Sequence, residues 1–196
     1  MGGGLQALKL QQDFQEQQLQ SCCSVRRPAA QVSWTRPPFP FLKLNVDGAL
    51  NFELGLRGLG AVLRNENGDL MLAVSKGMKG GFSVKATELY AAVLGFHTII
   101  QAGFQSTAII LEMDALGVIN AFNATDVDLS IEGALVEEVR NLFHFFSSVI
   151  CTFSPRKCNQ AAHSLAKKAL LFPAFQVWVE EGPQWLSDVL ISDVTI

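Results

Sequence analysis

Three acidic residues lie where a carboxylate is well placed to hold a metal ion. Asp47 and Asp114 each end a predicted strand, and Glu88 lies inside a predicted helix. Carboxylate oxygens are hard ligands that suit Mg²⁺ or Mn²⁺, and two such ions about 4 Å apart promote in-line displacement at a phosphodiester. Asp47 alone is better explained as a residue that ends a strand before a turn. The three together predict a metal site at one edge of a sheet.

The strand that ends at Asp47 has a clear period of two. Residues 41–50 place Leu42, Leu44 and Val46 on one face and the polar side chains that precede Asp47 on the other. Gly48 follows, and a glycine lets a ligand or another backbone approach closely. The chain therefore predicts a rigid strand that carries a carboxylate beside a site of close approach.

The remaining elements follow from turn signals and hydrophobic spacing. Strands are expected at 58–64 and 70–75, joined by an Asn-Gly turn, which favours an antiparallel hairpin. Ser83 can cap a helix that Gly103 terminates. Further elements are expected as a strand at 107–113, helices at 115–122 and 130–146, a strand at 149–153 and a helix at 159–172. The prediction is an α/β fold with a mixed five-stranded sheet.

Composition sets the class of protein. The chain has 196 residues, 49% of them hydrophobic, and a net charge of −3, which is not the basic footprint of a nucleic-acid-binding surface. Its apolar runs are too short to span a bilayer, and no secretory signal is recognised, so we expect an intracellular protein, with nucleus or cytoplasm undetermined. We expect a disordered or frayed-helical extension at 1–33, a domain at 34–172 and a tail at 173–196 that packs on the domain.

Several other side chains have both a functional and a structural interpretation. Arg156 and Lys157 are placed to bind phosphates of a nucleic acid, but surface solubility explains them equally well. Glu112 shares a strand face with Asp114 and could assist a metal, but a solvated or locally paired carboxylate is the better explanation. Trp178 and Trp185 are more plausibly anchors of the tail than platforms for bases.

Five stretches in one order carry a family resemblance: Lys43–Ala49, Gly58–Arg64, Ala86–Ala92, Leu111–Asp114 and Pro155–Ala166. Together they resemble the ribonuclease H-like (RNase H type 1, reverse-transcriptase-like) domain of plant retroelements and their free-standing plant relatives. The resemblance covers residues 34–172, and Trp178–Leu186 is similar to the tail of plant members. It implies a sheet ordered 3-2-1-4-5, with strands 4 and 5 parallel to strand 1 and helices on both faces.

The same resemblance implies roles for single residues. Asp47, Glu88 and Asp114 match acidic residues that hold two magnesium ions while water attacks the RNA strand of an RNA–DNA hybrid. His163 stands at the fourth acidic position, so it is expected to complete the metal and catalytic set. Asn159 matches the asparagine of the family, and Gly48, Asn159, Arg156 and Lys157 are expected to contact nucleic acid.

Two departures from the family pattern leave two functions open. A neutral histidine at 163 removes one negative charge from the site, and Phe153 stands where strongly catalytic members carry a mobile histidine. The first hypothesis is a hybrid ribonuclease that uses Mg²⁺ or Mn²⁺. The alternative is a domesticated module with little or no catalysis that binds nucleic acid or a protein partner. In either case we expect a monomer that does not engage membranes.

Overall fold

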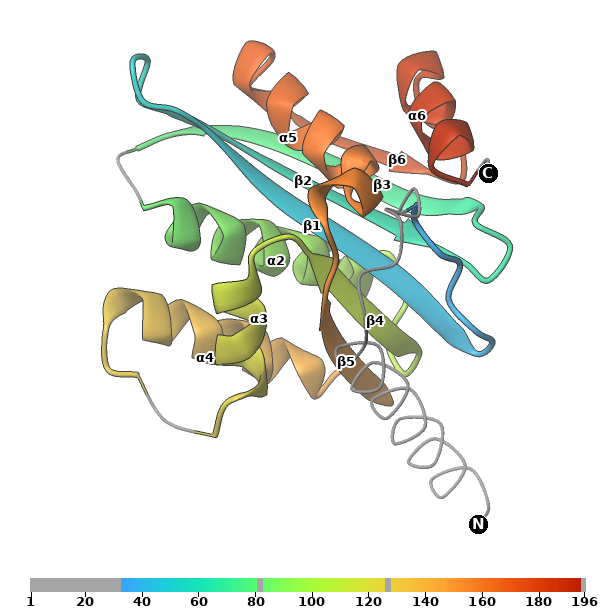
Figure 1. The fold of residues 1–196 in the computed structure, drawn as a ribbon, viewed down its shortest axis with the longest axis horizontal. Coiled ribbons are helices and arrows are strands. Elements are labelled where there is room, and N and C mark those ends of the chain that lie inside the picture. Colours follow the sequence, from blue (N-terminus) through green and yellow to red (C-terminus); the bar gives the residue numbers. More distant parts are fainter. Residues whose placement is uncertain (1–32, 81–82, 126–127, 195–196) are drawn as a thin grey trace, which may run out of the picture. The chain divides into compact units, whose positions relative to one another are not determined.

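The computed structural model describes residues 33–80, 83–125 and 128–194, and residues 33–196 form one compact unit. The expected N-terminal extension therefore lies almost entirely outside the described residues. The described chain contains one sheet in the order β5-β4-β1-β2-β3-β6 (Figure 1). Its strands are β1 (Phe41–Asn51), β2 (Leu56–Arg64), β3 (Leu70–Lys79), β4 (Ala108–Met113), β5 (Ser148–Phe153) and β6 (Phe175–Val179).

The order and direction of the first five strands confirm the sequence-based expectation. β1 pairs antiparallel with β2 and parallel with β4, and β4 pairs parallel with β5. In the register, Asn45 on β1 lies opposite Glu112 on β4. β1 continues to Asn51, so Asp47 lies inside the strand and not at its end as predicted, because residues 48–51 also pair with β2. Asp114, directly after β4, lies on the strand next to that part of β1.

The sheet has a sixth strand that the sequence analysis did not predict. β6 pairs antiparallel with β3, with Val177 opposite Val74. The strand is only five residues long and is preceded by Pro173, so its sequence is typical of an irregular tail and did not indicate a strand. The tail thus extends the sheet in addition to packing on it.

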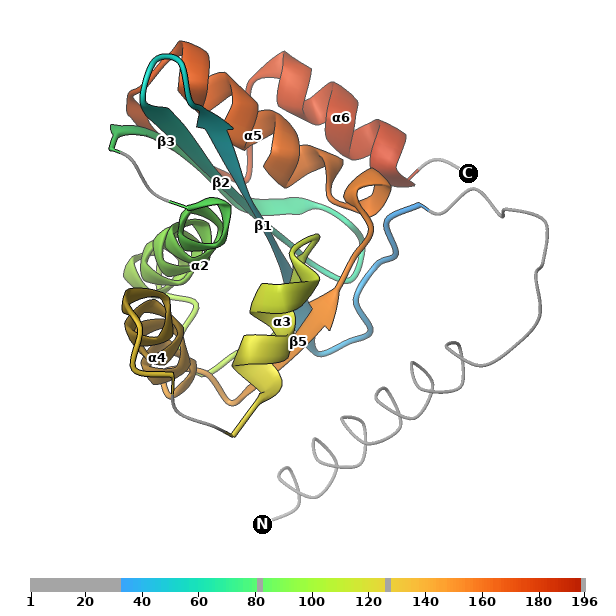
Figure 2. The same ribbon diagram turned by 60° about the vertical axis from the view of Figure 1, so that its left-hand side comes forward.

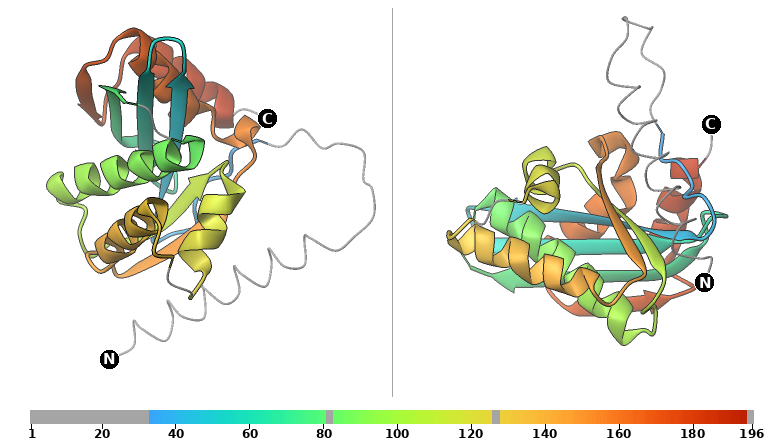
Figure 3. Two further views of the ribbon diagram at one scale, coloured as in Figure 1. Left: turned by 90° about the vertical axis from the view of Figure 1, so that its left-hand side faces the viewer. Right: turned by 90° about the horizontal axis from the view of Figure 1, so that it is seen from below.

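Helices cover both faces of the sheet (Figures 2 and 3). α2 (Val84–Gln101) lies on one face, with α4 (Ile131–Phe143) packed against it and α3 (Leu116–Asn123) nearby; α5 (Gln160–Leu171) and α6 (Gln184–Val194) lie on the other face. A short 3₁₀ turn, η1 (Arg156–Cys158), precedes α5. None of the helices in the described part of the chain is both long and apolar enough to cross a membrane.

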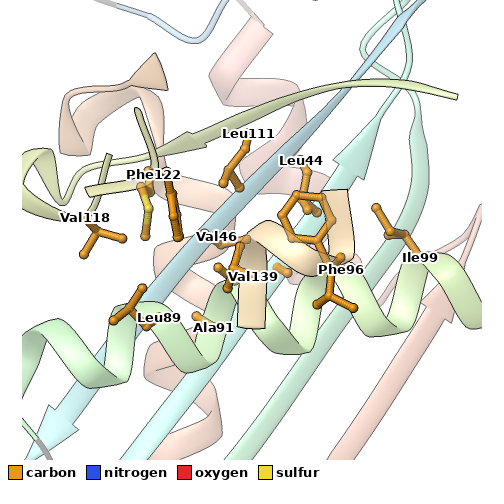
Figure 4. Close-up of a cluster of buried hydrophobic side chains, with 14 of the residues drawn as sticks. Leu44, Val46, Leu89, Ala91, Phe96, Ile99, Leu111, Val118, Phe122 and Val139 are labelled. Carbon is orange, nitrogen blue, oxygen red and sulfur yellow. The ribbon is translucent and has the colours of Figure 1, made fainter. Parts of the chain in front are cut away.

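The main core lies between α2 and the sheet. Leu44 and Val46 from β1 and Leu111 from β4 meet Phe96 and Ile99 of α2, and all five are fully buried (Figure 4). Leu44 and Val46 are the apolar positions that the period of two in β1 predicts, and Phe96 follows from the helical spacing of α2. Burial of large apolar side chains here fixes α2 on the sheet and with it the position of Glu88.

The ends of α2 confirm the predicted cap signals. The Ser83 side chain accepts a hydrogen bond of 3.0 Å from the backbone N–H of Ala86, which satisfies one of the free donors of the first turn. Gly103 follows the helix with φ of +91°, a conformation that glycine adopts at little cost.

Glycines in β2 set the position of α5. A Cβ at Gly60 would lie 2.6 Å from the backbone nitrogen of Ala166, and a Cβ at Gly58 would collide with the Ala166 carbonyl. The absence of side chains at these positions lets the helix backbone rest directly on the strand. This close packing brings His163 of α5 to the edge of the acidic site.

Candidate metal and nucleic-acid site

The three predicted carboxylates meet at one point. Oxygens of Asp47, Glu88 and Asp114 lie within 4.8 Å of one another, although the residues come from β1, from α2 and from the position after β4. Asp47 is fully buried and Glu88 is 4% exposed, while Asp114 is partly exposed. The site therefore opens to solvent on the side of Asp114.

Gly48 joins Asp47 to Glu88. Its backbone N–H donates a hydrogen bond of 3.2 Å to Glu88 Oε2. A Cβ at this position would lie 2.9 Å from the backbone carbon of Thr87, so the contact between β1 and α2 requires glycine. The structure thus assigns to Gly48 the close backbone approach that its residue type suggested.

Crowding changes the protonation of the carboxylates. Burial, with the nearby Asp47 and Asp114 carboxylates, raises the pKa of Glu88 to about 9. Burial and the Asp114 carboxylate also raise the pKa of Asp47 well above its usual range. Asp47 Oδ1 is buried and has no hydrogen-bond partner among the residues that the structure describes. Carboxylates that repel one another and a buried oxygen without a donor both fit a hard divalent cation.

His163 contacts the acidic set through Asp47. Its Nδ1 lies 2.7 Å from Asp47 Oδ2. Burial and the positive charges of Arg156 and Lys167 lower the pKa of His163, so the imidazole is neutral at pH 7. In the tautomer with its proton on Nδ1, the neutral ring donates to the Asp47 carboxylate and leaves Nε2 as the nitrogen with a lone pair for a ligand.

The predicted nucleic-acid-binding residues take different positions. Arg156 Nε donates a bond of 2.9 Å to Asp114 Oδ2, and 60% of the arginine side chain remains exposed. Asn159 is buried, and its amide donates 2.8 Å to the Val46 carbonyl, which ties the start of α5 to β1. Lys157 is exposed and makes no ion pair among the described residues. Arg156 and Lys157 thus face solvent beside the site, whereas Asn159 holds the framework.

Glu112 belongs to a separate buried polar cluster. Its carboxylate lies 2.6 Å from Lys43 Nζ and accepts a bond of 3.1 Å from the amide of Asn45. The interpretation of Glu112 as a locally paired carboxylate is therefore confirmed. Lys43, Asn45 and Asp47 alternate along β1, so their side chains share one face of the strand. This pattern in the sequence indicates that polar side chains gather on that face.

The two tail tryptophans pack on the body of the domain. Trp178 of β6 and Trp185 at the start of α6 make an edge-to-face contact with ring centroids 6.4 Å apart. Lys168 Nζ lies 4.5 Å from the centroid of the Trp185 ring. Both rings join the apolar cluster between β2, β3, α5 and α6, in agreement with their interpretation as anchors.

Comparison with protein families gives one match that covers most of the domain. The family model described as "Reverse transcriptase-like" matches residues 45–169, a range that includes all four candidate metal residues. No curated protein matches the chain.

The fold is similar to that of solved ribonucleases H. RNase H1 from the halophilic archaeon Halobacterium salinarum NRC-1 is 22% identical with a TM-score of 0.61, over 67% of this chain and 98% of that one. The N-terminal RNase H domain of Rv2228c from Mycobacterium tuberculosis is 18% identical, with a TM-score of 0.60 over 68% and 95% of the two chains. LC11-RNase H1, solved in complex with an RNA/DNA hybrid, is 17% identical, with a TM-score of 0.59 over 67% and 97%.

Proposed function

Because this chain belongs to the reverse transcriptase-like family, we propose that it is a metal-dependent endoribonuclease that cleaves the RNA strand of RNA–DNA hybrids. The observation that carries the proposal is the group of Asp47, Glu88 and Asp114, whose oxygens lie within 4.8 Å of one another. Hard oxygen ligands so close together favour Mg²⁺, with Mn²⁺ as a substitute.

Each residue has a distinct task in this proposal. Asp47, Glu88 and Asp114 would hold the ions, with His163 as a fourth ligand through Nε2. Divalent ions at this site supply the Lewis-acid chemistry of phosphodiester hydrolysis. Gly48 fixes Glu88 through its N–H, and the Nδ1–H of His163 fixes Asp47. These two contacts hold the carboxylates in place before any ligand arrives.

A nucleic-acid substrate fits the open side of the site. Arg156 is exposed beside Asp114, and Lys157, which follows it in η1, is also exposed. Both would supply the positive charge that a phosphate backbone needs. The structure of LC11-RNase H1 with an RNA/DNA hybrid supports this class of substrate. Only Nε of Arg156 is bonded to Asp114, so the terminal nitrogens of the exposed guanidinium are placed to bind a phosphate while that contact persists.

The test is hybrid cleavage by the full chain with Mg²⁺ and with Mn²⁺. Asp47→Asn removes one charged ligand and should abolish metal-dependent cleavage. Asp188→Asn is the matched control, since Asp188 is exposed on α6 and pairs with Gln184. If wild type and Asp47→Asn cleave alike with either metal, the enzyme proposal is wrong.

One observation favours the alternative function, a weakly catalytic module that binds nucleic acid. Two of the three carboxylates already have cationic or imidazole partners, since Asp114 pairs with Arg156 and Asp47 with His163. Anisotropy measurements with a labelled hybrid separate the two functions. Binding that depends on Arg156 and Lys157, without cleavage in either metal, would favour the module over the enzyme.

A further inference from the structure

β6 forms an edge of the sheet that no described element covers. Phe175, Val177 and Val179 project from one face of this strand and are 58%, 39% and 57% exposed. Natural edge strands usually carry a lysine, a proline or a bulge that blocks pairing with another strand. None of these lies within residues 175–179.

The backbone of β6 presents a regular set of outward groups. The N–H of Glu180 donates 3.2 Å to the Met71 carbonyl, in register with the pairing of Val179 and Leu72. Directions alternate along an antiparallel ladder, so Trp178 and Gln176 turn their backbone groups toward β3. The backbone groups of Phe175, Val177 and Val179 consequently point to the open edge, where the Val179 carbonyl already accepts a bond of 2.6 Å from the Glu181 N–H.

This outward set is symmetric about Val177. We propose that β6 pairs antiparallel with β6 of a second copy of this chain, around a two-fold axis at Val177. The axis places Val177 opposite its own counterpart and Phe175 opposite Val179 of the second copy. The outward groups of the three residues then pair between the copies, with the Val179 carbonyl accepting a second bond through its other lone pair, and the apolar side chains align on one face.

The surroundings of the strand fit a second copy. Pairing stops after the same five residues in both copies, at Pro173 on one side and at Glu180, whose φ is +61°, on the other. Antiparallel pairing brings Glu180 and Glu181 of one copy beside the Phe175 end of the other. Lys76 lies at that end, with its Nζ 6.0 Å from the centroid of the Phe175 ring. Opposite charges therefore meet at both ends of the interface.

The dimer does not cover the acidic site, and it does not rest on the proposed function. β2 and β3 separate β6 from β1, so Asp47 lies well away from the new interface. An interface built around five residues is small, and interfaces below about 1,000 Å² are weak. Dimerisation is therefore concentration-dependent, and it replaces the monomer expected from the sequence.

Sedimentation velocity on the full chain tests the proposal, over a range from about 1 μM to about 1 mM in protein. Wild type should shift from monomer to dimer. Val177→Lys and Val177→Glu should each be monomeric, because each variant places two like charges at the axis. An equimolar mixture of the two should dimerise again, because lysine then faces glutamate.

Val84→Lys is the matched control, since Val84 is exposed at the start of α2, and it should dimerise like wild type. Hydrogen exchange on wild type needs no variant: the amides of Phe175, Val177 and Val179 should exchange more slowly as the concentration rises. Any of four results would overturn the proposal. The first two are a wild type that stays monomeric and a Val177→Lys variant that dimerises. The others are a mixture of the two variants that stays monomeric and exchange at these amides that does not depend on concentration.

Discussion

Glu88 makes the metal-free protein sensitive to pH. Its pKa in the folded state is raised to about 9 from an ordinary 4.5, chiefly by burial, with Asp47 and Asp114 adding repulsion. The folded state therefore binds more protons than the unfolded state between these two values. The stability that Glu88 contributes is fully present below pH 4.5 and is lost as pH rises toward 9.

We therefore expect Glu88→Gln to raise the thermal unfolding temperature of the metal-free protein at pH 8 and to flatten its dependence on pH. The reason is that glutamine keeps the shape and never ionises. Thermal unfolding with a chelator between about pH 5 and pH 9 measures this. Glu138→Gln, at an exposed position on α4, should follow the wild-type curve. Equal pH dependence for Glu88→Gln and wild type would contradict the raised pKa of Glu88 in the folded state.

His163→Asp should tighten metal binding and raise hybrid cleavage, most clearly with Mg²⁺. The three carboxylates supply about −3 against +4 from two divalent ions, and aspartate adds the missing charge. Changes at residues that surround a metal shift affinity by about 10- to 100-fold. Isothermal titration with Mg²⁺ and Mn²⁺ gives the measurement.

The control for this prediction is His163→Asn, which shortens the side chain equally but adds no charge. It also removes the imidazole contact with Asp47. If the aspartate and asparagine variants bind each metal equally, then charge at position 163 does not act on the site, and its assignment as the fourth ligand position is wrong.

At the scale of elements, the contact between α5 and β2 depends on glycine. Gly60→Ala should destabilise the domain by about 1–3 kcal/mol, because the added methyl meets the α5 backbone and the helix must shift. Gly117→Ala is the matched control, because a Cβ at Gly117 in α3 meets nothing within 4 Å. Replacing that helical glycine should stabilise by up to about 1 kcal/mol. Denaturant unfolding of both variants measures the difference, and equal effects would contradict the close packing.

The elements that sequence predicted best are those with a repeated local signal. β1 and α2 combine periodicity with a clear turn or cap, so Asp47 and Glu88 were placed on the right elements. β6 was missed because its pairing with β3 joins residues about 100 positions apart and has no local signature. The ion pair of Arg156 with Asp114 was missed for the same reason, since only the folded chain brings η1 to the end of β4.

At the scale of the whole domain, a buried polar cluster ties both ends of the described chain to the sheet. The guanidinium of Arg64 in β2 makes two contacts. Its Cζ lies 3.4 Å from the centroid of the Trp34 ring, and its Nη1 lies 3.1 Å from Asp193 Oδ2 in α6. Trp34 and Arg64 both donate to Asn45 Oδ1, at 3.0 Å and 3.2 Å. Trp34 and Asp193 lie outside residues 45–169, the range that the family model matches. The cluster therefore binds segments on both sides of that range to the sheet.

Removal of only one partner of the buried Arg64–Asp193 ion pair should lower the stability of the domain strongly. The Arg64 and Asp193 side chains are 0% and 3% exposed, and burial lowers the pKa of Arg64 to about 10 while it raises that of Asp193. Asp193→Ala leaves a buried guanidinium without its counter-charge and should destabilise the domain by about 3–5 kcal/mol in denaturant unfolding. Asp188→Ala, at an exposed site on the same helix, should change stability by less than about 0.5 kcal/mol.

The double variant Arg64→Met with Asp193→Leu separates the loss of the ion pair from the loss of packing. Both charges disappear and apolar volume replaces them, so this variant should be clearly more stable than Asp193→Ala. Such a result identifies the unpaired Arg64 charge as the source of the single variant's cost. If the double variant is as unstable as Asp193→Ala, then contacts of the pair with Trp34 and Asn45, rather than charge balance, hold the two ends of the chain on the sheet.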